Sequence, residues 1–236
     1  MVDTVKIIET NIAKVRGKIG TSAEASGRTA SAVTLVAVCK YFGSDVTANV
    51  VEAGCGDVGE NRPQSLWSKA SDLSSLDVRF HQIGHLQRNK VRRTITCINL
   101  LHAGDSLRLI NSVSAESVKQ GIITRVLIEV NISGDESKHG FRPTEVESVL
   151  DDVSRLPNID IQGLMGMSGY DSDPSKTQHE FAQLRELRES LISYCPENVS
   201  LKHLSMGMTR DYELAVREGA TIVRIGTALF DGIPRV

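Results

Sequence analysis

The sequence is poor in aromatic residues, which make up 4% of its 236 residues, and it carries no excess of positive charge. Its formal net charge at pH 7 is −2. A general nucleic-acid-binding protein needs a basic surface to contact phosphates and aromatic side chains on which bases stack. Both shortages therefore argue against nucleic acid as a partner.

Cysteine is also scarce. No two cysteines form a C-x-x-C pair, and no group of cysteine and histidine residues has the spacing of a zinc finger. Free thiols in a reducing compartment are the simpler interpretation. The four residues are Cys39, Cys55, Cys97 and Cys195.

Long apolar segments are absent as well. The first 20 residues instead predict an amphipathic helix, because apolar residues recur at steps of three and four: Val5, Ile8, Ile12, Val15 and Ile19. This segment lacks the features of a signal peptide, and no segment approaches the roughly 20 apolar residues that cross a membrane. We therefore expect a cytoplasmic protein without a membrane partner.

No linker rich in proline, glycine or serine divides the chain, so we expect one domain over residues 1–236. Eight short apolar runs recur along it, and their β-branched residues and polar ends favour strands over helices. These runs are residues 34–40, 57–61, 78–84, 99–105, 125–132, 159–168, 200–207 and 221–227.

Helical patterns lie between most of the expected strands. They include residues 44–54, 144–156, 176–194 and 209–219, with expected caps at Ser44, Thr144 and Thr209. Alternation of strand and helix implies parallel strands with right-handed crossovers. Eight repeats predict an α/β fold, a single (β/α)8 TIM barrel with an extra N-terminal helix. A doubly wound open sheet is the alternative.

Polar residues gather at the carboxyl ends of the expected strands, where barrels of this kind carry out their chemistry. The set comprises Lys40, Asn61, His81 to Gly84, Asp105, Asn131, Ser168, Ser205, Gly226 and Thr227.

Lys40 shares one strand face with Val36 and Val38. An amine directed into the barrel mouth is partly desolvated, which lowers its pKa toward the nucleophilic neutral form. Such a lysine can form a Schiff base with an aldehyde. From position alone, a solvent-exposed lysine just beyond a strand is the commoner situation.

The segment VRIGTALF (223–230) indicates an anion site near the C-terminus. Gly226 allows the backbone to approach a phosphate, Thr227 adds a hydroxyl, and Ser205 at the end of the seventh strand is a natural partner. A tight turn without a ligand is equally compatible with the pattern. Arg224 shares a face with Gly226, and a buried arginine needs an acceptor, either a ligand atom or an ordinary salt bridge.

Two other patterns have simpler interpretations. His81 and His85 are four residues apart, but a strand and a glycine separate them and Gln82 follows the first, so the zincin pattern is not met and no metal is expected. The basic run RNKVRR (88–93) is typical of a solvated helix face.

Taken together, the motifs resemble one known family, the pyridoxal phosphate homeostasis proteins, which are PLP-binding proteins of the alanine racemase N-terminal type. The matching segments span nearly the whole chain in the family's order. They are AVCK (37–40), VGEN (58–61), FHQIGHLQRNK (80–90), VLIEVNISGDESKHG (126–140), IQGLMGM (161–167) and LSMGMTRDYELAVREGATIVRIGTALF (204–230).

The resemblance implies a barrel of the fold-type III class that holds pyridoxal 5′-phosphate (PLP). Lys40 corresponds to the lysine that forms the Schiff base. Asn61 and Met206 would lie near the ring, and Arg224 would face the ring nitrogen. The phosphate ligands would be Ser205, Gly226 and Thr227, while His81 and Ser168 would line the site.

An arginine opposite the ring nitrogen can only donate a hydrogen bond, so it keeps that nitrogen unprotonated and makes the ring a weaker electron sink. A racemase also needs acid/base groups on both faces of the cofactor, and related racemases take one from a further domain. Only nine residues follow Thr227, so no such domain is expected. These points favour a non-catalytic carrier over an enzyme.

Three functions stay open. The first is a PLP homeostasis protein, with B6 vitamers and apo-PLP enzymes as partners and a monomer or weak dimer as its state. The second is a racemase-like or other PLP enzyme of low activity, with a residue such as His81 or Ser168 as the second base. The third is a barrel enzyme that acts on a phosphorylated metabolite without PLP.

Overall fold

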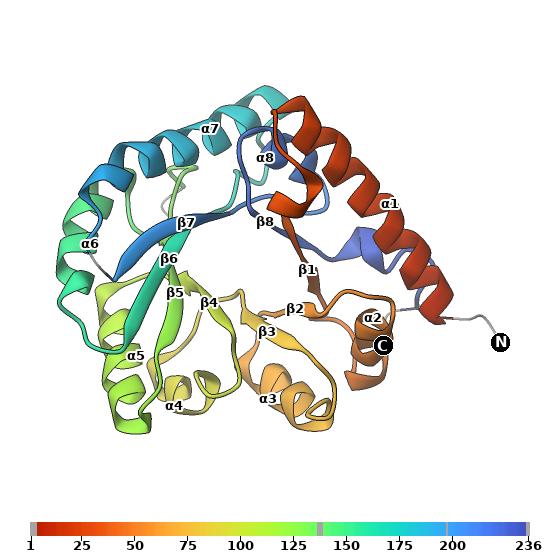
Figure 1. Ribbon diagram of the computed structural model, residues 1–236, viewed down its shortest axis with the longest axis horizontal. Coiled ribbons are helices and arrows are strands. Elements are labelled where there is room, and N and C mark those ends of the chain that lie inside the picture. The colour runs from red at the N-terminus through yellow and green to blue at the C-terminus, as the bar shows by residue number, and fades with distance from the viewer. Residues whose placement is uncertain (1–3, 136–138, 197, 235–236) are drawn as a thin grey trace.

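Eight parallel strands close into a barrel in the computed structural model, which describes residues 4–135, 139–196 and 198–234 (Figure 1). Each strand pairs with the next in the chain, and the last pairs with the first. The predicted barrel is therefore confirmed, and the open sheet is not formed. The strands are β1 (Thr34–Val38), β2 (Asp57–Glu60), β3 (Arg79–Gln82), β4 (Leu100–Gly104), β5 (Thr124–Val130), β6 (Ile159–Gly166), β7 (Val199–Ser205) and β8 (Ile222–Ile225).

A ring of helices surrounds the barrel (Figure 1). It is formed by α1 (Thr4–Ala25), α2 (Ser44–Glu52), α3 (Pro63–Asp72), α4 (Val91–Thr94), α5 (Leu107–Gln120), α6 (Val146–Ser154), α7 (Pro174–Leu191) and α8 (Tyr212–Arg217). Short 3₁₀ turns add η1 (Ala30–Ala32), η2 (Arg88–Lys90), η3 (Pro143–Glu145), η4 (Ile192–Tyr194) and η5 (Thr227–Leu229).

The predicted N-terminal helix, α1, precedes the barrel and packs against α8, α2 and η5. Of its predicted apolar stripe, Ile8, Ile12, Val15 and Ile19 are at most 3% exposed, while Val5 is half-buried. Asn11 on the same helix donates hydrogen bonds to the carbonyls of Leu229 (3.1 Å) and Asp231 (3.0 Å). The helix thereby ties down the segment that follows β8.

Three predicted helix caps are wrong: Ser44, Thr144 and Thr209. The capping positions are Gly43 for α2, Arg142 for the turn η3 that leads into α6, and Asp211 for α8. Ser44 illustrates the reason, because its hydroxyl donates to Asp72 Oδ2 at 2.5 Å. A side chain that finds a partner elsewhere in the fold does not cap its own helix, and a local sequence pattern cannot reveal that partner.

Apolar residues fill two separate spaces. A large cluster lies between the barrel and its helices, and a small one lies inside the barrel around Val36, Leu127 and Ile222. Side chains two residues apart on a strand share a face. Arg224 therefore follows Ile222 into the barrel interior, and Glu129 follows Leu127. The interior thus combines an apolar cluster with buried polar groups.

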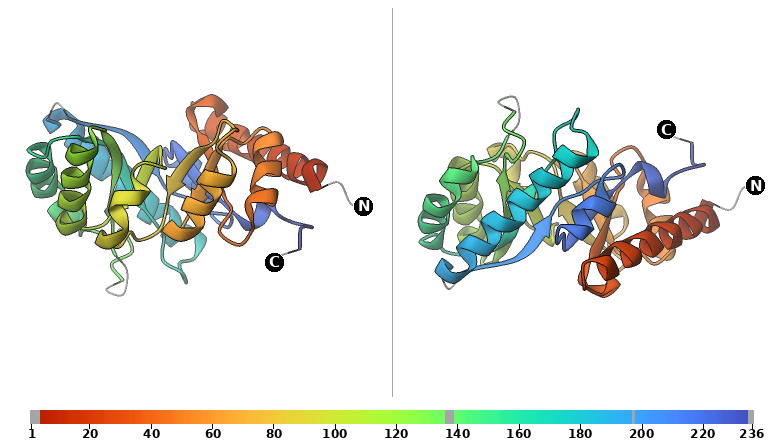
Figure 2. Two further views of the ribbon diagram at one scale, coloured as in Figure 1. Left: turned by 90° about the horizontal axis from the view of Figure 1, so that it is seen from below. Right: turned by 90° about the horizontal axis from the view of Figure 1, so that it is seen from above.

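The segments that follow β5 and β6 project from the same end of the barrel (Figure 2). Because all eight strands are parallel, this end carries every strand's carboxyl terminus, and we call it the mouth. Within the described ranges, no helix combines the length and the apolar character needed to cross a membrane.

Candidate functional site

Lys40 lies at the mouth, in the turn that follows β1. The strand ends at Val38, and the turn closes with a hydrogen bond from the Phe42 amide to the Cys39 carbonyl (3.0 Å). Lys40 is exposed, with its Nζ 5.0 Å from the centre of the Tyr41 ring. The expected position at the mouth is confirmed, but the expected burial is not, because the strand ends two residues earlier than predicted.

A buried ion pair holds the backbone beside Lys40. Lys69, from α3, donates to the Cys39 carbonyl at 2.8 Å and also pairs with Glu60 at the end of β2. The side chains of Lys69 and Glu60 are only 4% and 0% exposed. Burial raises the pKa of Glu60, and the neighbouring Lys69 ammonium opposes that rise. The Gly-Glu-Asn motif therefore contributes to positioning the lysine.

A chain of hydrogen bonds crosses the barrel interior. Asp57 Oδ1 lies 3.0 Å from His81 Nε2, and His81 Nδ1 lies 2.9 Å from His102 Nε2. His102 Nδ1 lies 2.9 Å from Ser205 Oγ, which accepts a hydrogen bond from Arg224 Nη1 at 2.5 Å. Five side chains from β2, β3, β4, β7 and β8 are thus connected, and we call them the interior chain.

The direction of each hydrogen bond in the interior chain follows from its two ends when both imidazoles are neutral. The Asp57 carboxylate can only accept, so His81 donates to it from Nε2 and accepts at Nδ1 from His102 Nε2. His102 then accepts at Nδ1 from the Ser205 hydroxyl, and the oxygen of that hydroxyl accepts from Arg224. All donors point the same way in this assignment, and both histidines carry their proton on Nε2.

Three shifted pKa values agree with this direction. Burial alone would raise the pKa of Asp57, but hydrogen bonds from His81 and Arg79 outweigh it and lower the pKa to about 2. Burial, followed by electrostatic interactions with His81 and Arg224, lowers the pKa of His102 well below its usual value, so this ring is neutral. Burial lowers the pKa of Arg224 to about 10, which leaves the guanidinium charged at pH 7.

Arg224 is held rigidly beneath the mouth. Besides the Ser205 hydroxyl, its guanidinium binds the Ser205 carbonyl (2.8 Å) and the Gly166 carbonyl (3.2 Å). The side chain is 4% exposed. The resemblance places this residue opposite a cofactor ring nitrogen, and the structure gives it the fixed, charged and buried state that this role requires.

Ser205 and Thr227, both expected to bind phosphate, lie in different surroundings. Ser205 is fully buried, and its single proton is already donated to His102. Thr227 is exposed at the start of η5, directly after Gly226. The first amides of such a turn have no partner within it. Gly226 and Thr227 therefore offer hydrogen-bond donors that an anion could accept. The Ser205 hydroxyl instead accepts a hydrogen bond from Arg224 and holds its guanidinium in place.

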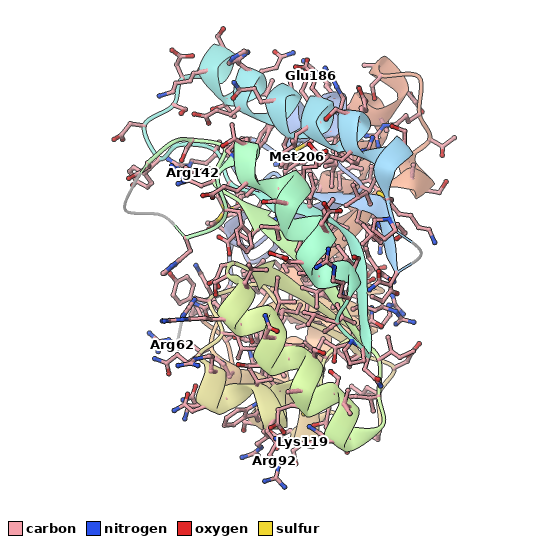
Figure 3. The ribbon with its side chains drawn as sticks, turned by 90° about the vertical axis from the view of Figure 1, so that its left-hand side faces the viewer. Arg62, Arg92, Lys119, Arg142, Glu186 and Met206 are labelled. Atoms are coloured by element: carbon pink, nitrogen blue, oxygen red, sulfur yellow. The ribbon has the colours of Figure 1, made fainter. Side chains whose placement is uncertain are left out.

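The remaining expected residues lie at different depths. Asn61 is half-buried at the end of β2, where Gly84 packs so closely that a Cβ would come within 2.7 Å of the Asn61 carbonyl. Ser168 donates to Asp211 Oδ2 at 2.8 Å and thereby connects the segments after β6 and β7. Met206 is fully buried in the cluster between the barrel and the helices (Figure 3). The side chain of Met206 therefore faces away from the interior.

Sequence reasoning missed Glu129, which is 5% exposed. Burial and the nearby Asp105 carboxylate raise the pKa of Glu129 to about 7. No hydrogen bond connects its carboxyl group to another side chain among the described residues. Strand alternation was the available signal, because Glu129 lies two residues before Asn131 in an otherwise apolar run.

A cavity of about 330 Å³ lies at the opposite end of the barrel. It is lined in part by Asp57 and Arg79, which form a bidentate ion pair. This cavity is distant from Lys40, but it places one end of the interior chain close to solvent.

Comparison with known proteins shows the family of this chain. Residues 23–234 match the family described as alanine racemase, N-terminal domain. The chain belongs to this family. A relative from Aquifex aeolicus, named pyridoxal phosphate homeostasis protein, is 37% identical over 219 residues, 93% of this chain and 95% of the relative. A human relative with the same name is 34% identical over 206 residues, 83% of this chain and 75% of the relative.

Solved structures extend the likeness to the fold. PipY of Synechococcus elongatus with PLP bound has a TM-score of 0.83 and 30% identity, covering 94% of this chain and 99% of PipY. An alanine racemase from Clostridium difficile has a TM-score of 0.74 at 12% identity, so it supports the fold alone. The matched region covers 97% of this chain but only 59% of that racemase.

Proposed function

We propose that this protein binds PLP through a Schiff base on Lys40 and serves in PLP homeostasis in the cytoplasm. The observation that carries the proposal is the grouping, at one end of adjacent strands β1 and β8, of an amine, a buried arginine and exposed turn amides. The names of the relatives and the PLP-bound structure of PipY support the same ligand.

The residues present fit each chemical part of PLP. The exposed amine of Lys40 suits the aldehyde, and the amides and hydroxyl at Gly226 and Thr227 suit the phosphate. The buried guanidinium of Arg224 is a fixed donor for the unprotonated ring nitrogen. Asn61 and the backbone of Met206 would flank the ring. His81 and Ser168 would support the site indirectly, through the residues to which they are hydrogen-bonded.

The side chains around the proposed PLP site favour binding of the cofactor over catalysis with it. PLP supplies a reactive aldehyde and a ring that can accept electrons when its nitrogen is protonated. Arg224 cannot give up a proton at neutral pH, and the interior chain fixes its orientation. We therefore propose a carrier with negligible turnover, whose partners are B6 vitamers and apo-PLP enzymes and which exists as a monomer or weak dimer.

Glu129 gives the racemase-like alternative a specific basis. A buried carboxyl group with a pKa of about 7 can exchange a proton at physiological pH. The alternative therefore requires Glu129 to move protons during turnover, whereas the carrier proposal does not.

Exchange of the α-hydrogen of amino acids in deuterated water, followed by NMR, distinguishes the two functions. We expect the PLP-loaded protein to exchange the α-hydrogen of L-alanine far more slowly than 1 s⁻¹, a rate typical of slow enzymes. We also expect the Glu129→Gln variant to behave identically. Exchange at about 1 s⁻¹ or faster that disappears in Glu129→Gln would replace the carrier by the racemase.

A further inference from the structure

Three potential metal ligands meet at the mouth, on the loops that follow three consecutive strands. His85 lies shortly after β3, Asp105 directly follows β4, and His139 lies in the segment after β5. None of the three forms part of the proposed PLP contacts or of the interior chain. The barrel topology brings them together, because β3, β4 and β5 are neighbours.

The geometry of this triad suits one small cation. One donor atom from each residue lies within 4.8 Å of the other two. His85 Nδ1 is 2.5 Å from Asp105 Oδ2, and the rings of His85 and His139 stack with centres 4.6 Å apart at 16°. In a tetrahedral zinc site the donors are about 3.3 Å apart. Both histidines are exposed, so small side-chain rotations suffice to reach that spacing.

The backbone that directly follows His139 is anchored to β5. Gly140, the next residue, has a φ of +105°, and a Cβ there would lie 2.9 Å from the Glu129 carbonyl. The Phe141 amide then donates to that same carbonyl (2.8 Å), and the Asn131 amide donates to the Phe141 carbonyl (2.9 Å). The base of the loop is therefore anchored to the end of β5, next to Glu129.

The local charge also favours a cation. Asp105 is 8% exposed and Glu129 is 5% exposed, and the two carboxyl groups are close enough to interact electrostatically. The carboxylate of Asp105 has His85 as its only ion-pair partner among the described residues. Like charges at low exposure repel each other, and a bound divalent ion relieves that repulsion.

We propose that His85, Asp105 and His139 bind one divalent transition-metal ion, with Zn²⁺ as the representative. Two imidazoles and one carboxylate are one of the donor sets of three-ligand zinc sites, which leave a further position open to water or to an oxygen of a small ligand. Mg²⁺ and Ca²⁺ prefer sets made of oxygen atoms alone. This site is independent of PLP and goes beyond the proposed homeostasis function.

The first test is isothermal titration calorimetry of ZnCl₂ into the metal-free and PLP-free protein. We expect one equivalent to bind, with unchanged affinity in the presence of an excess of Mg²⁺. The His85→Ala and His139→Ala variants should each weaken binding at least about 100-fold, because removing even an outer partner of a metal ligand costs about 10- to 100-fold. The His179→Ala variant is the matched control, since His179 is an exposed histidine on α7.

Absorption spectra with Co²⁺ provide a second readout that reports the ligands directly. The wild-type protein and His179→Ala should give the same visible bands, and both triad variants should lose them. Failure of the wild-type protein to bind Zn²⁺ would overturn the proposal. Equal binding by wild type, His85→Ala and His139→Ala, or an equal loss in His179→Ala, would overturn it too. Because the tests use PLP-free protein, their outcome does not depend on whether Lys40 holds PLP.

Discussion

The Ser205→Ala substitution interrupts the interior chain at its centre. It removes the acceptor of a charged hydrogen bond from Arg224 and the donor that satisfies His102 Nδ1. A hydrogen bond to a charged group contributes about 1.5–3 kcal/mol, and a buried acceptor left unsatisfied costs about 1–3 kcal/mol. The two effects overlap, so we expect the free energy of unfolding to fall by about 3 kcal/mol.

Urea denaturation of the PLP-free protein measures this loss. With a slope of about 3 kcal/mol per molar urea, the midpoint should fall by about 1 M. Ser200→Ala is the matched control, because Ser200 lies on the same strand and has only a 3.5 Å contact with a carbonyl. Its midpoint should stay within about 0.2 M of wild type, as expected for a substitution that costs about 0.5 kcal/mol.

Ligand binding separates the two roles that Ser205 could have. If Ser205 holds Arg224, Ser205→Ala should weaken PLP and pyridoxal by the same factor, because pyridoxal differs only in lacking the phosphate. Thr227→Val should instead weaken PLP alone, about 10- to 100-fold for one charged hydrogen bond. A selective loss of PLP in Ser205→Ala, or an unchanged urea midpoint, would refute the reasoning.

Three further predictions concern the surroundings of the site. Glu60→Gln should lower the free energy of unfolding by about 3–5 kcal/mol in a urea titration, because it leaves the buried Lys69 ammonium without its carboxylate; a loss below 1 kcal/mol would contradict this. Burial raises the pKa of Cys39 to about 12, so iodoacetamide at pH 8 should label Cys97 but spare Cys39 until urea is added, as peptide mass spectrometry can check. The pKa of Asp57 is about 2 in the fold against an ordinary 3.8, so its stabilising contribution is complete above pH 4 and lost as the pH falls toward 2. Wild type should therefore lose more stability over that range than Asp57→Asn, and parallel losses would argue against the Asp57–His81 bond.

The fold was predictable because the sequence patterns that indicate strands and helices recur along the chain. Each of the eight apolar runs overlaps a strand, and four of the five residues in the expected stripe of α1 are buried. Strand ends were less accurate, and the consequence is visible at Lys40, which lies in a turn because β1 ends at Val38. A period of two residues identifies the face of a strand but does not determine where its hydrogen bonding stops.

The candidate site was predictable only in part. The positions of Lys40, Arg224, Gly226 and Thr227 could be predicted because each lies on a strand face or at a strand end. The partners of Ser205 could not, since His102 comes from β4 and is separated from Ser205 by 103 residues. Contacts across a barrel depend on register and closure, which a local sequence pattern does not contain.

The most direct measurement of the central proposal is mass spectrometry of the protein after incubation with PLP and reduction with borohydride. We expect one pyridoxyl group per chain, located on the peptide that contains Lys40. Lys40→Ala should abolish the adduct, whereas Lys202→Ala, which removes an exposed lysine of β7, should leave it unchanged. An adduct located on Lys90 or Lys138, or one that persists in Lys40→Ala, would contradict the account.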